Sequence, residues 1–248
     1  QIWVNDSIKA LKTISNNIIK DYGGNVIAIT GSNGKTTTTN IIGKTLKNNS
    51  KTLKNFNNEI GMPLSLMNAS SKSKNLIFEI GASKLNDIDY LSKILQPNVG
   101  LITNIGYSHL ESLKNIDGVF KVKSEIVKNI KKNGFLVVPN NNKKHLNKWK
   151  KMRSDITTIS FGMKDDSDFY PIDVKIKQNG LSFLVTSRLI EKPIKISSSL
   201  EGVHNVKNIL SACAVHYCLD QNLQDFSKSI SFSKLDNLRQ VNYTWLKG

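Results

Sequence analysis

A glycine-rich loop that joins an apolar strand to a helix constrains the fold of this chain more than any other feature. Residues 26–30 read Val-Ile-Ala-Ile-Thr, and Gly31-Ser32-Asn33-Gly34-Lys35-Thr36-Thr37 follows directly. Glycines let backbone N–H groups surround a phosphate, and the next helix points its positive end at it. The loop therefore predicts a nucleoside triphosphate site, in which Lys35 contacts the terminal phosphates and Thr36 offers its hydroxyl to Mg²⁺. The general pattern has glycine at position 29, where this chain has Ile29.

Alternating strand and helix patterns predict the rest of the fold. Runs typical of buried strands occupy residues 26–30, 76–80, 99–105 and 135–138, and helical patterns begin at residue 35 and cover residues 85–95 and 119–130. This order predicts an α/β fold of the phosphate-loop type, with a mostly parallel sheet and helices on both faces. The turn signal Asn179-Gly180 lies between alternating segments and predicts a small antiparallel extension at the sheet edge. Further helical patterns lie at residues 8–18, 206–219 and 223–230.

The composition is that of an ordinary globular protein. Of the 248 residues, 39% are hydrophobic and 22% are charged, which excludes a disordered or fibrous chain. No apolar run approaches the roughly 20 residues of a membrane-spanning helix, and the N-terminus lacks the pattern of a signal peptide. We therefore expect a cytoplasmic protein with no membrane partner.

Cys213 and Cys218 lie five positions apart in a helical pattern, which favours two core thiols over a disulfide.

The net charge of +16 raises the possibility of nucleic-acid binding. Lysine supplies nearly all of this charge, as is typical of a chain from an AT-rich genome, and no nucleic-acid motif accompanies it. The densest basic stretch, residues 143–151, has the spacing of a solvated helix face. We expect no nucleic-acid partner and keep a nucleic-acid-binding NTPase as the weaker hypothesis. The cluster Asp165, Asp166 and Asp168 lacks the glycine and closing glutamate of a calcium loop, and we interpret it as a solvated turn.

Two further side chains follow the ends of predicted strands. Glu79 closes the apolar run 76–79, and His109 follows the third strand and Asn104. The carboxyl ends of parallel strands meet at one edge of a sheet, where ligands bind. A carboxylate and a neutral imidazole at this edge are candidate metal ligands.

In order and spacing, these residues resemble the Mur ligase family, whose shorter glycine pattern accounts for Ile29. The motifs that carry the resemblance are Thr30-Gly-Ser-Asn-Gly-Lys-Thr-Thr37, Glu79-Ile-Gly-Ala-Ser83, Thr103-Asn104-Ile, Ser108-His109-Leu, Lys123-Ser-Glu125-Ile and Gly202-Val-His204-Asn205-Val-Lys-Asn208. The segment Asn55-Phe-Asn57-Asn58-Glu-Ile-Gly61-Met-Pro63 resembles the Asn-rich loop of one branch of that family, which adds D-alanyl-D-alanine to UDP-N-acetylmuramoyl-tripeptide.

The resemblance implies a role for each matching residue. Lys35 would bind the β and γ phosphates, Thr36 and Glu79 would hold one Mg²⁺, and His109 a second. Lys123 matches a lysine that the family commonly carbamylates, although the residues alone suggest an exposed helix position. Implied catalytic residues are Lys35, Lys123 and His109, with Lys123 also near the metals. Implied nucleotide contacts are Gly31, Ser32, Asn33, Gly34, Lys35, Thr36, Thr37, Asn104, His204, Asn205, Asn208 and Arg239, and implied substrate contacts are Asn55, Asn57, Asn58 and Ser83.

Several positions depart from the family pattern. Lys54 and Asn86 stand where the family commonly has glycine, and Lys114-Asn115 stands where it commonly has Gly-Ser. Arg239 lacks the glycine that usually precedes it. None of these departures removes a chemical group from the proposed site.

The resemblance implies an ATP-dependent ligase that forms an amide bond through an acyl phosphate, with UDP-N-acetylmuramoyl-tripeptide and D-alanyl-D-alanine as partners, two Mg²⁺ ions as cofactors, and a monomeric state. Family members have three domains. We expect residues 1–22 to lead in from an N-terminal domain outside this chain, residues 23–248 to form the central ATP-binding domain, and the C-terminal domain to be absent. The alternatives are another Mur or folylpolyglutamate-type ligase, which the Asn-rich loop disfavours, and an ATP-binding module without catalysis.

Overall fold

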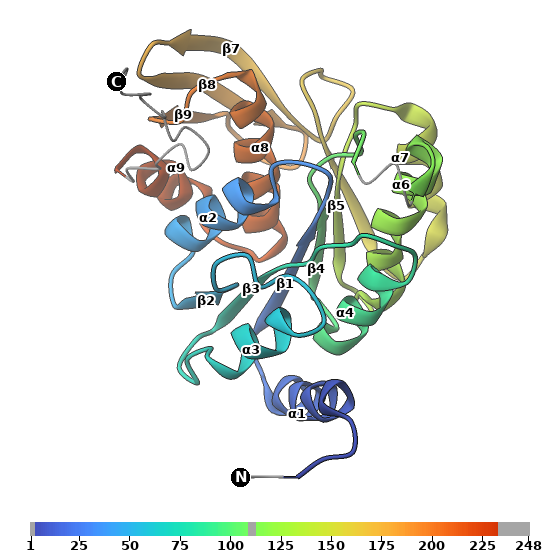
Figure 1. The fold of residues 1–248 in the computed structure, drawn as a ribbon. Helices are drawn as coiled ribbons and strands as arrows, with labels where there is room; N and C mark the ends of the chain where they lie inside the picture. Colours follow the sequence, from blue (N-terminus) through green and yellow to red (C-terminus); the bar gives the residue numbers. More distant parts are fainter. Residues whose placement is uncertain (1–2, 109–112, 233–248) are drawn as a thin grey trace, which may run out of the picture.

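The computed structural model describes residues 3–108 and 113–232, whose strands form one sheet in the order β2-β3-β1-β4-β5-β6-β7-β8-β9 (Figure 1). The strands are β1 (Asn25–Thr30), β2 (Asn49–Lys51), β3 (Asn75–Glu79), β4 (Val99–Ile102), β5 (Phe135–Pro139), β6 (Thr157–Phe161), β7 (Phe169–Lys177), β8 (Gly180–Ser187) and β9 (Ile194–Ser198). The helices are α1 (Ser7–Asp21), α2 (Lys35–Thr45), α3 (Gly61–Met67), α4 (Asp87–Leu95), α6 (Ile116–Lys123), the 3₁₀ helix η1 (Ser124–Asn129), α7 (Lys143–Met152), α8 (Val203–Cys218) and α9 (Leu223–Phe232).

The sheet confirms the predicted fold class. Along the sheet, every neighbouring pair of strands from β2 to β7 is parallel, including the two pairs that β1 makes. The pairs β7–β8 and β8–β9 are antiparallel. The predicted hairpin is β7 and β8, and Lys177 faces Gly180 across the turn that contains Asn179. Because β1 lies between β3 and β4, the ends of three strands meet beside the glycine-rich loop.

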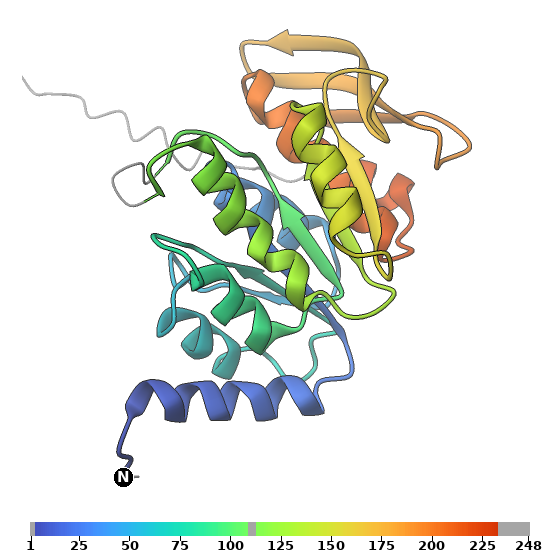
Figure 2. The same cartoon turned by 90° about the vertical axis from the view of Figure 1, so that its right-hand side faces the viewer.

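Helices cover both faces of the sheet, as Figures 1 and 2 show. In β1, Ile27 and Ile29 belong to one buried cluster, which includes residues of α2, α8 and α9. Val26 and Ala28 belong to the other, which includes residues of α1, α3, α4, α6 and α7. A strand buried on both faces reads as a continuous apolar run, which explains the pattern of residues 26–29.

Two predicted elements end earlier than the sequence indicates. The third strand ends at Ile102 instead of residue 105, because Thr103 and Asn104 turn away to bond the glycine-rich loop. The helix expected at residues 119–130 is α6 followed by the tighter η1. Elements β2, α3, β6 and β9 lie outside the predicted runs. Strand β2 has three residues and β6 begins with two threonines, so neither carries a clear apolar pattern.

One interpretation of a polar residue needs correction. Asp168 is not part of a solvated turn, since it is 4% exposed and accepts hydrogen bonds from the backbone N–H and the hydroxyl of Ser160. The basic stretch has the predicted solvated face, since the lysines of α7 are exposed, while Trp149 of the same helix is fully buried and donates to Ser124 Oγ. Cys213 and Cys218 are buried free thiols, as predicted. In the described ranges, no helix has both the length and the apolar character that a membrane span requires.

Candidate functional site

The glycine-rich loop lies between the end of β1 and the start of α2. Gly31 has a φ of 144° and Gly34 a φ of 81°, values that residues with a side chain rarely adopt. A Cβ atom at Gly31 would collide with the Thr103 hydroxyl, and one at Gly34 would collide with the Asn208 side chain. Both glycines are therefore required by this loop conformation, and helix α2 begins directly after it at Lys35.

The turn after β4 fixes the loop from the neighbouring strand. Asn104 accepts hydrogen bonds from the backbone N–H of Asn33 at its Oδ1 (2.7 Å) and from the N–H of Ser32 at its carbonyl (3.2 Å). Thr103 Oγ1 donates to the Asn33 carbonyl (2.6 Å). Asn104, which the resemblance predicts to contact the nucleotide, thus fixes the backbone of the glycine-rich loop, called the phosphate loop below.

A hydroxyl and a carboxylate meet beneath the loop. Thr36 Oγ1 donates to Glu79 Oε2 (2.8 Å), and Asn57 Nδ2 donates to Glu79 Oε1 (3.0 Å). Glu79 is 5% exposed, and its backbone N–H donates to Thr52 Oγ1 (2.7 Å). The structure therefore brings together the predicted metal ligands Thr36 and Glu79 and links them to the Asn-rich loop through Asn57.

These two residues fit a magnesium ion by their chemistry. A hydroxyl and a carboxylate are the hard oxygen ligands that Mg²⁺ prefers, and the ion usually takes few ligands from protein and the rest from water and phosphate. Within the described ranges, no group of three or more acidic, histidine or cysteine side chains gathers at one point. The third predicted ligand, His109, lies outside the described residues, as does Arg239.

A first cavity of about 1080 Å³ extends from the glycine-rich loop to the first turn of α8. Its lining includes the predicted nucleotide contacts Asn33, Gly34, Thr36, Thr37, Asn104, His204, Asn205 and Asn208. Asn208 Nδ2 donates to Asn205 Oδ1 (2.9 Å), and Asn205 Nδ2 donates to the Glu201 carbonyl (2.7 Å), which fixes both amides at the start of the helix. The opposite wall comes from the loops after β5 and β6, where Lys143 pairs with Asp166 at 3.5 Å.

A second cavity of about 970 Å³ contains Lys35, Lys123, Asn57, Asn58 and Ser83 in its lining. Lys35 Nζ donates to the Gly31 carbonyl (2.8 Å). Lys123 is 1% exposed, so the exposed position that the residues alone suggest is wrong. Burial, and then the charge of Lys35, lowers the pKa of Lys123 to about 8. Residues of the glycine-rich loop and the start of α2 thus line both cavities.

Two further residues predicted to contact the substrate, Asn58 and Ser83, form hydrogen bonds with residues close to them in the sequence. Asn58 Oδ1 accepts a hydrogen bond from the N–H of Gly61 (2.8 Å) at the start of α3. Ser83 donates from its N–H (2.9 Å) and its hydroxyl (3.1 Å) to Asp87 Oδ2. Asn55 is exposed and lines neither cavity, so the structure does not bring it to the site.

Three of the residues that depart from the family pattern share a backbone conformation. Lys54 (φ 48°), Asn86 (φ 70°) and Lys114 (φ 64°) all have positive φ. Glycine adopts this region without strain, which explains why glycine is common at these positions. Asn115 accepts a hydrogen bond from the Gly118 N–H (2.9 Å) and caps α6, a role that serine also performs.

Sequence reasoning missed three residues that shape the site, namely Thr103, Asp87 and Glu125. Asp87 and Glu125 lie inside motifs that carry the resemblance or its departures, but their carboxylates accept hydrogen bonds mostly from backbone N–H groups. Such partners leave no pattern in the sequence. The threonine before Asn104 offered a signal, because it ends a strand beside the phosphate loop.

Comparisons with known proteins agree with this geometry. A family model described as the Mur ligase middle domain matches residues 29–216. The UDP-N-acetylmuramoyl-tripeptide--D-alanyl-D-alanine ligase of Buchnera aphidicola subsp. Baizongia pistaciae is 36% identical over 87% of this chain and 47% of its own length. The ligase of the same name from Bacillus subtilis is 31% identical over 96% of this chain and 51% of its own.

Solved structures give the same result. A crystal structure of MurF from Acinetobacter baumannii has a TM-score of 0.87 at 28% identity, over 94% of this chain and 51% of that one. MurF ligase from Thermotoga maritima in complex with ADP has a TM-score of 0.81 at 27% identity, over 91% and 53%. The chain spans about half the length of the curated relatives it matches. With the family model matching most of its length, the chain belongs to the Mur ligase family and carries that family's middle domain.

Proposed function

We propose that this chain is the nucleotide-binding part of an ATP-dependent ligase that joins D-alanyl-D-alanine to UDP-N-acetylmuramoyl-tripeptide. The observation that carries the proposal is that the glycine-rich loop lines one cavity through Asn33 and Gly34, while Lys35 lines a second cavity together with Lys123. The relatives from Buchnera and Bacillus bear the name of this reaction. The need for ATP supports a cytoplasmic location, and the lining of both cavities by one chain supports a monomer.

In the proposed reaction, the first cavity holds the adenosine of ATP and the second holds the tripeptide end of the UDP-linked substrate. The terminal carboxylate of the tripeptide attacks the γ-phosphorus, which gives an acyl phosphate and ADP. The amine of D-alanyl-D-alanine then attacks the acyl carbon, and the tetrahedral intermediate expels phosphate.

The first step brings together two anions, so catalysis depends on positive charge. Lys35 would move from the Gly31 carbonyl to the β and γ phosphates, and the N–H groups of residues 31–35 would surround them. Thr36 and Glu79 would hold Mg²⁺, which supplies charge neutralisation at the phosphates when bound. His109, as predicted, would contribute to a second ion, and Arg239 would lie near the nucleotide.

Lys123 supports a more specific proposal, that its amine takes up CO₂. A pKa of about 8 leaves part of the Lys123 population neutral near pH 7, and only the neutral amine reacts. The product is a carbamate plus a released proton, which turns a buried cation beside Lys35 into an anion that suits a metal site. Incubation with ¹³C-bicarbonate should give a carbamate NMR signal that is lost in Lys123→Ala and kept in Lys121→Ala, whose lysine is exposed on the same helix.

The function is tested by a ligase assay with the complete protein that carries these residues. With ATP, Mg²⁺ and both substrates, we expect ADP, phosphate and the pentapeptide product, and no turnover in Lys35→Ala. An ¹⁸O label in the tripeptide carboxylate should appear in the released phosphate, because the acyl phosphate transfers that oxygen. Turnover with a free amino acid in place of D-alanyl-D-alanine would assign another ligase of the family. ATP binding without turnover would leave a nucleotide-binding module.

A further inference from the structure

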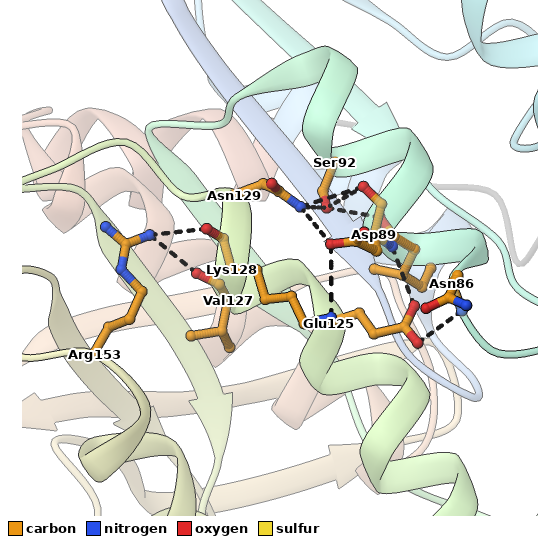
Figure 3. A network of polar contacts seen from close by, with 9 residues as sticks. Asn86, Asp89, Ser92, Glu125, Val127, Lys128, Asn129 and Arg153 are labelled. Atoms are coloured by element: carbon orange, nitrogen blue, oxygen red, sulfur yellow. Dashed lines mark hydrogen bonds and ion pairs between the residues drawn. The ribbon is translucent and has the colours of Figure 1, made fainter.

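Helix α4 begins with a cap that comes from a distant segment of the chain. Glu125 Oε1 accepts the backbone N–H of Asn86 (2.8 Å), and its Oε2 accepts the N–H of Asp89 (3.1 Å). Figure 3 shows this carboxylate lying against the first turn of the helix. Glu125 is 4% exposed, and the first N–H groups of a helix have no partners within the helix. Its buried carboxylate therefore supplies acceptors for two donors at the start of α4.

Glu125 supplies this cap because the residues at the start of α4, Asn86 and Asp87, do not cap the helix themselves. Asn86 occupies the N-cap position with positive φ, and its side chain makes no capping hydrogen bond. Asp87 turns its carboxylate backwards, where Oδ2 accepts the N–H of Ser83 (2.9 Å) and the N–H of Lys84 (3.0 Å). Thus Asp87 shapes the loop before the helix, and Glu125 fixes the helix end that carries Asp87.

These contacts join two walls of the second cavity. Ser83, Asn86 and Asp87 line one part of it, and Lys123 lines another. Glu125 lies two residues after Lys123, where α6 gives way to η1, so one short segment carries both the buried lysine and the cap. The distance between Lys123 and the Ser83 loop is therefore set through the Glu125 carboxylate.

A second set of contacts holds the same two elements together at Asp89, which also lines the cavity, and at Ser92. Asn129 Nδ2 donates to the Asp89 carbonyl (3.2 Å) and to Ser92 Oγ (3.0 Å), and Lys128 pairs with Asp89 at 3.8 Å. Arg153 donates to the carbonyls of Val127 and Lys128 at the other end of η1 (Figure 3). Neither Asn129 nor Arg153 lines the second cavity. Asn129 thus offers a control that loosens the contact of η1 with α4 at Asp89 and Ser92 and keeps the hydrogen bonds of Glu125 to the first turn of α4.

We propose that Glu125 is a positioning residue, which holds the Ser83 loop and Lys123 in register so that the second cavity binds the tripeptide end of the UDP-linked substrate. This inference rests on the proposed function. It predicts that loss of the carboxylate weakens binding of that substrate and leaves ATP binding unchanged, because the first cavity shares no residue with this cap.

The test compares Glu125→Ala, Glu125→Gln and Asn129→Ala in the complete protein. Glu125→Ala should raise KM for the UDP-linked substrate about tenfold, the size of a lost helix cap, with KM for ATP unchanged. Glu125→Gln keeps one acceptor oxygen and should give a smaller increase, about threefold, which also covers the case in which the alanine variant fails to fold. Asn129→Ala should lower the Tm and leave both KM values unchanged.

Amide hydrogen exchange in the 248-residue chain supplies a readout that does not need turnover. Exchange at residues 83–89 should accelerate in both Glu125 variants, whereas Asn129→Ala should leave residues 83–87 unchanged. Unchanged exchange in the Glu125 variants, or an equal rise in KM in Asn129→Ala, would overturn the inference. A wild-type protein without ligase activity would overturn the proposed function instead, and the exchange measurement would still decide whether Glu125 holds the loop.

Discussion

Three residues with positive φ, Lys54, Asn86 and Lys114, carry side chains where the backbone favours glycine. For an L-residue this region costs about 1–2 kcal/mol, chiefly because Cβ approaches the following carbonyl oxygen. Asparagine tolerates the region better than lysine, since its short polar side chain bonds locally. The backbone strain is therefore larger at Lys54 and Lys114 than at Asn86, although all three residues stand where the family commonly has glycine.

Lys54→Gly should stabilise the chain. Relief of the left-handed strain outweighs the extra backbone entropy of glycine in the unfolded state, which costs about 0.5–1 kcal/mol. We expect a net gain of about 0.5–1 kcal/mol in the free energy of unfolding, measured by urea denaturation. Asn86→Gly is the matched control and should give a smaller gain. A loss of stability in Lys54→Gly would show that the lysine makes contacts that outweigh the strain.

His216 should make the stability of the chain depend on pH. The ring is buried, its centroid lies 4.6 Å from that of Phe226, and Nδ1 lies 2.9 Å from the Ala212 carbonyl oxygen. Burial lowers the pKa of His216, so the unfolded chain takes up a proton near pH 6.5 while the folded chain does not. The free energy of unfolding should therefore fall as the pH falls from about 6.5 towards the lowered folded pKa.

Thermal unfolding between pH 7 and pH 5 measures this effect. The decrease in Tm should be reduced in His216→Gln and retained in His204→Gln, whose histidine is exposed at the other end of the same helix. An identical pH dependence in the His216 variant would assign the effect to other groups.

For single residues, the sequence predicts which chemical groups belong to the site better than it predicts how buried each side chain is. Lys35, Thr36 and Glu79 could be assigned because the strand and loop patterns place them at one sheet edge. Lys123 could not be recognised as buried from the residues alone, since η1 and α4 pack against its helix, α6, only in the folded chain. The same reason hides Glu125, whose partners are backbone N–H groups 39 and 36 positions away.

Among the elements, the junction of β6 and β7 connects the parallel sheet to its antiparallel extension. These strands share one residue pair, Phe161 and Phe169. Asp168 strengthens the junction, because it accepts the N–H of Ser160 (2.8 Å) and pairs with Arg188. The Arg188 side chain is 75% exposed, so solvent screens its contribution.

Asp168→Ala should therefore cost much more stability than Arg188→Ala. Removal of the carboxylate leaves the Ser160 N–H and hydroxyl buried without this partner, at a cost of about 2–3 kcal/mol. Removal of the exposed arginine should cost less than about 1 kcal/mol. Urea denaturation of both variants measures the two values. Equal losses would indicate that the ion pair, and not the bonds to Ser160, holds the junction.

The parallel core of the sheet was predictable because its strands are continuous apolar runs, and β7 and β8 because Asn179-Gly180 marks their turn. Strands β2 and β6 were not predictable. Asn49-Ser-Lys51 has no apolar residue, and its pairing with β3 depends on the neighbouring strand. Helix α3 follows the Asn-rich loop and contains Pro63 in its first turn, a position that proline tolerates but that gives no periodic pattern.

For the whole molecule, the strand order brings the glycine-rich loop to a sheet edge where its residues line both cavities, the arrangement on which the proposed function depends. The sequence predicted the shared sheet edge, because the apolar runs of β1, β3 and β4 end there, but it did not predict the two cavities. The predictions for His109 and Arg239, the domain boundaries and the monomeric state stay predictions.

Calorimetric titration of the 248-residue chain with a non-hydrolysable ATP analogue and Mg²⁺ tests the central claim, that the glycine-rich loop and the first cavity form an ATP site. We predict magnesium-dependent binding that weakens at least about tenfold in Lys35→Ala, is retained in Lys121→Ala and is weaker for a GTP analogue. A folded chain that binds no nucleotide, or one in which Lys35→Ala binds as tightly as the wild type, would contradict it.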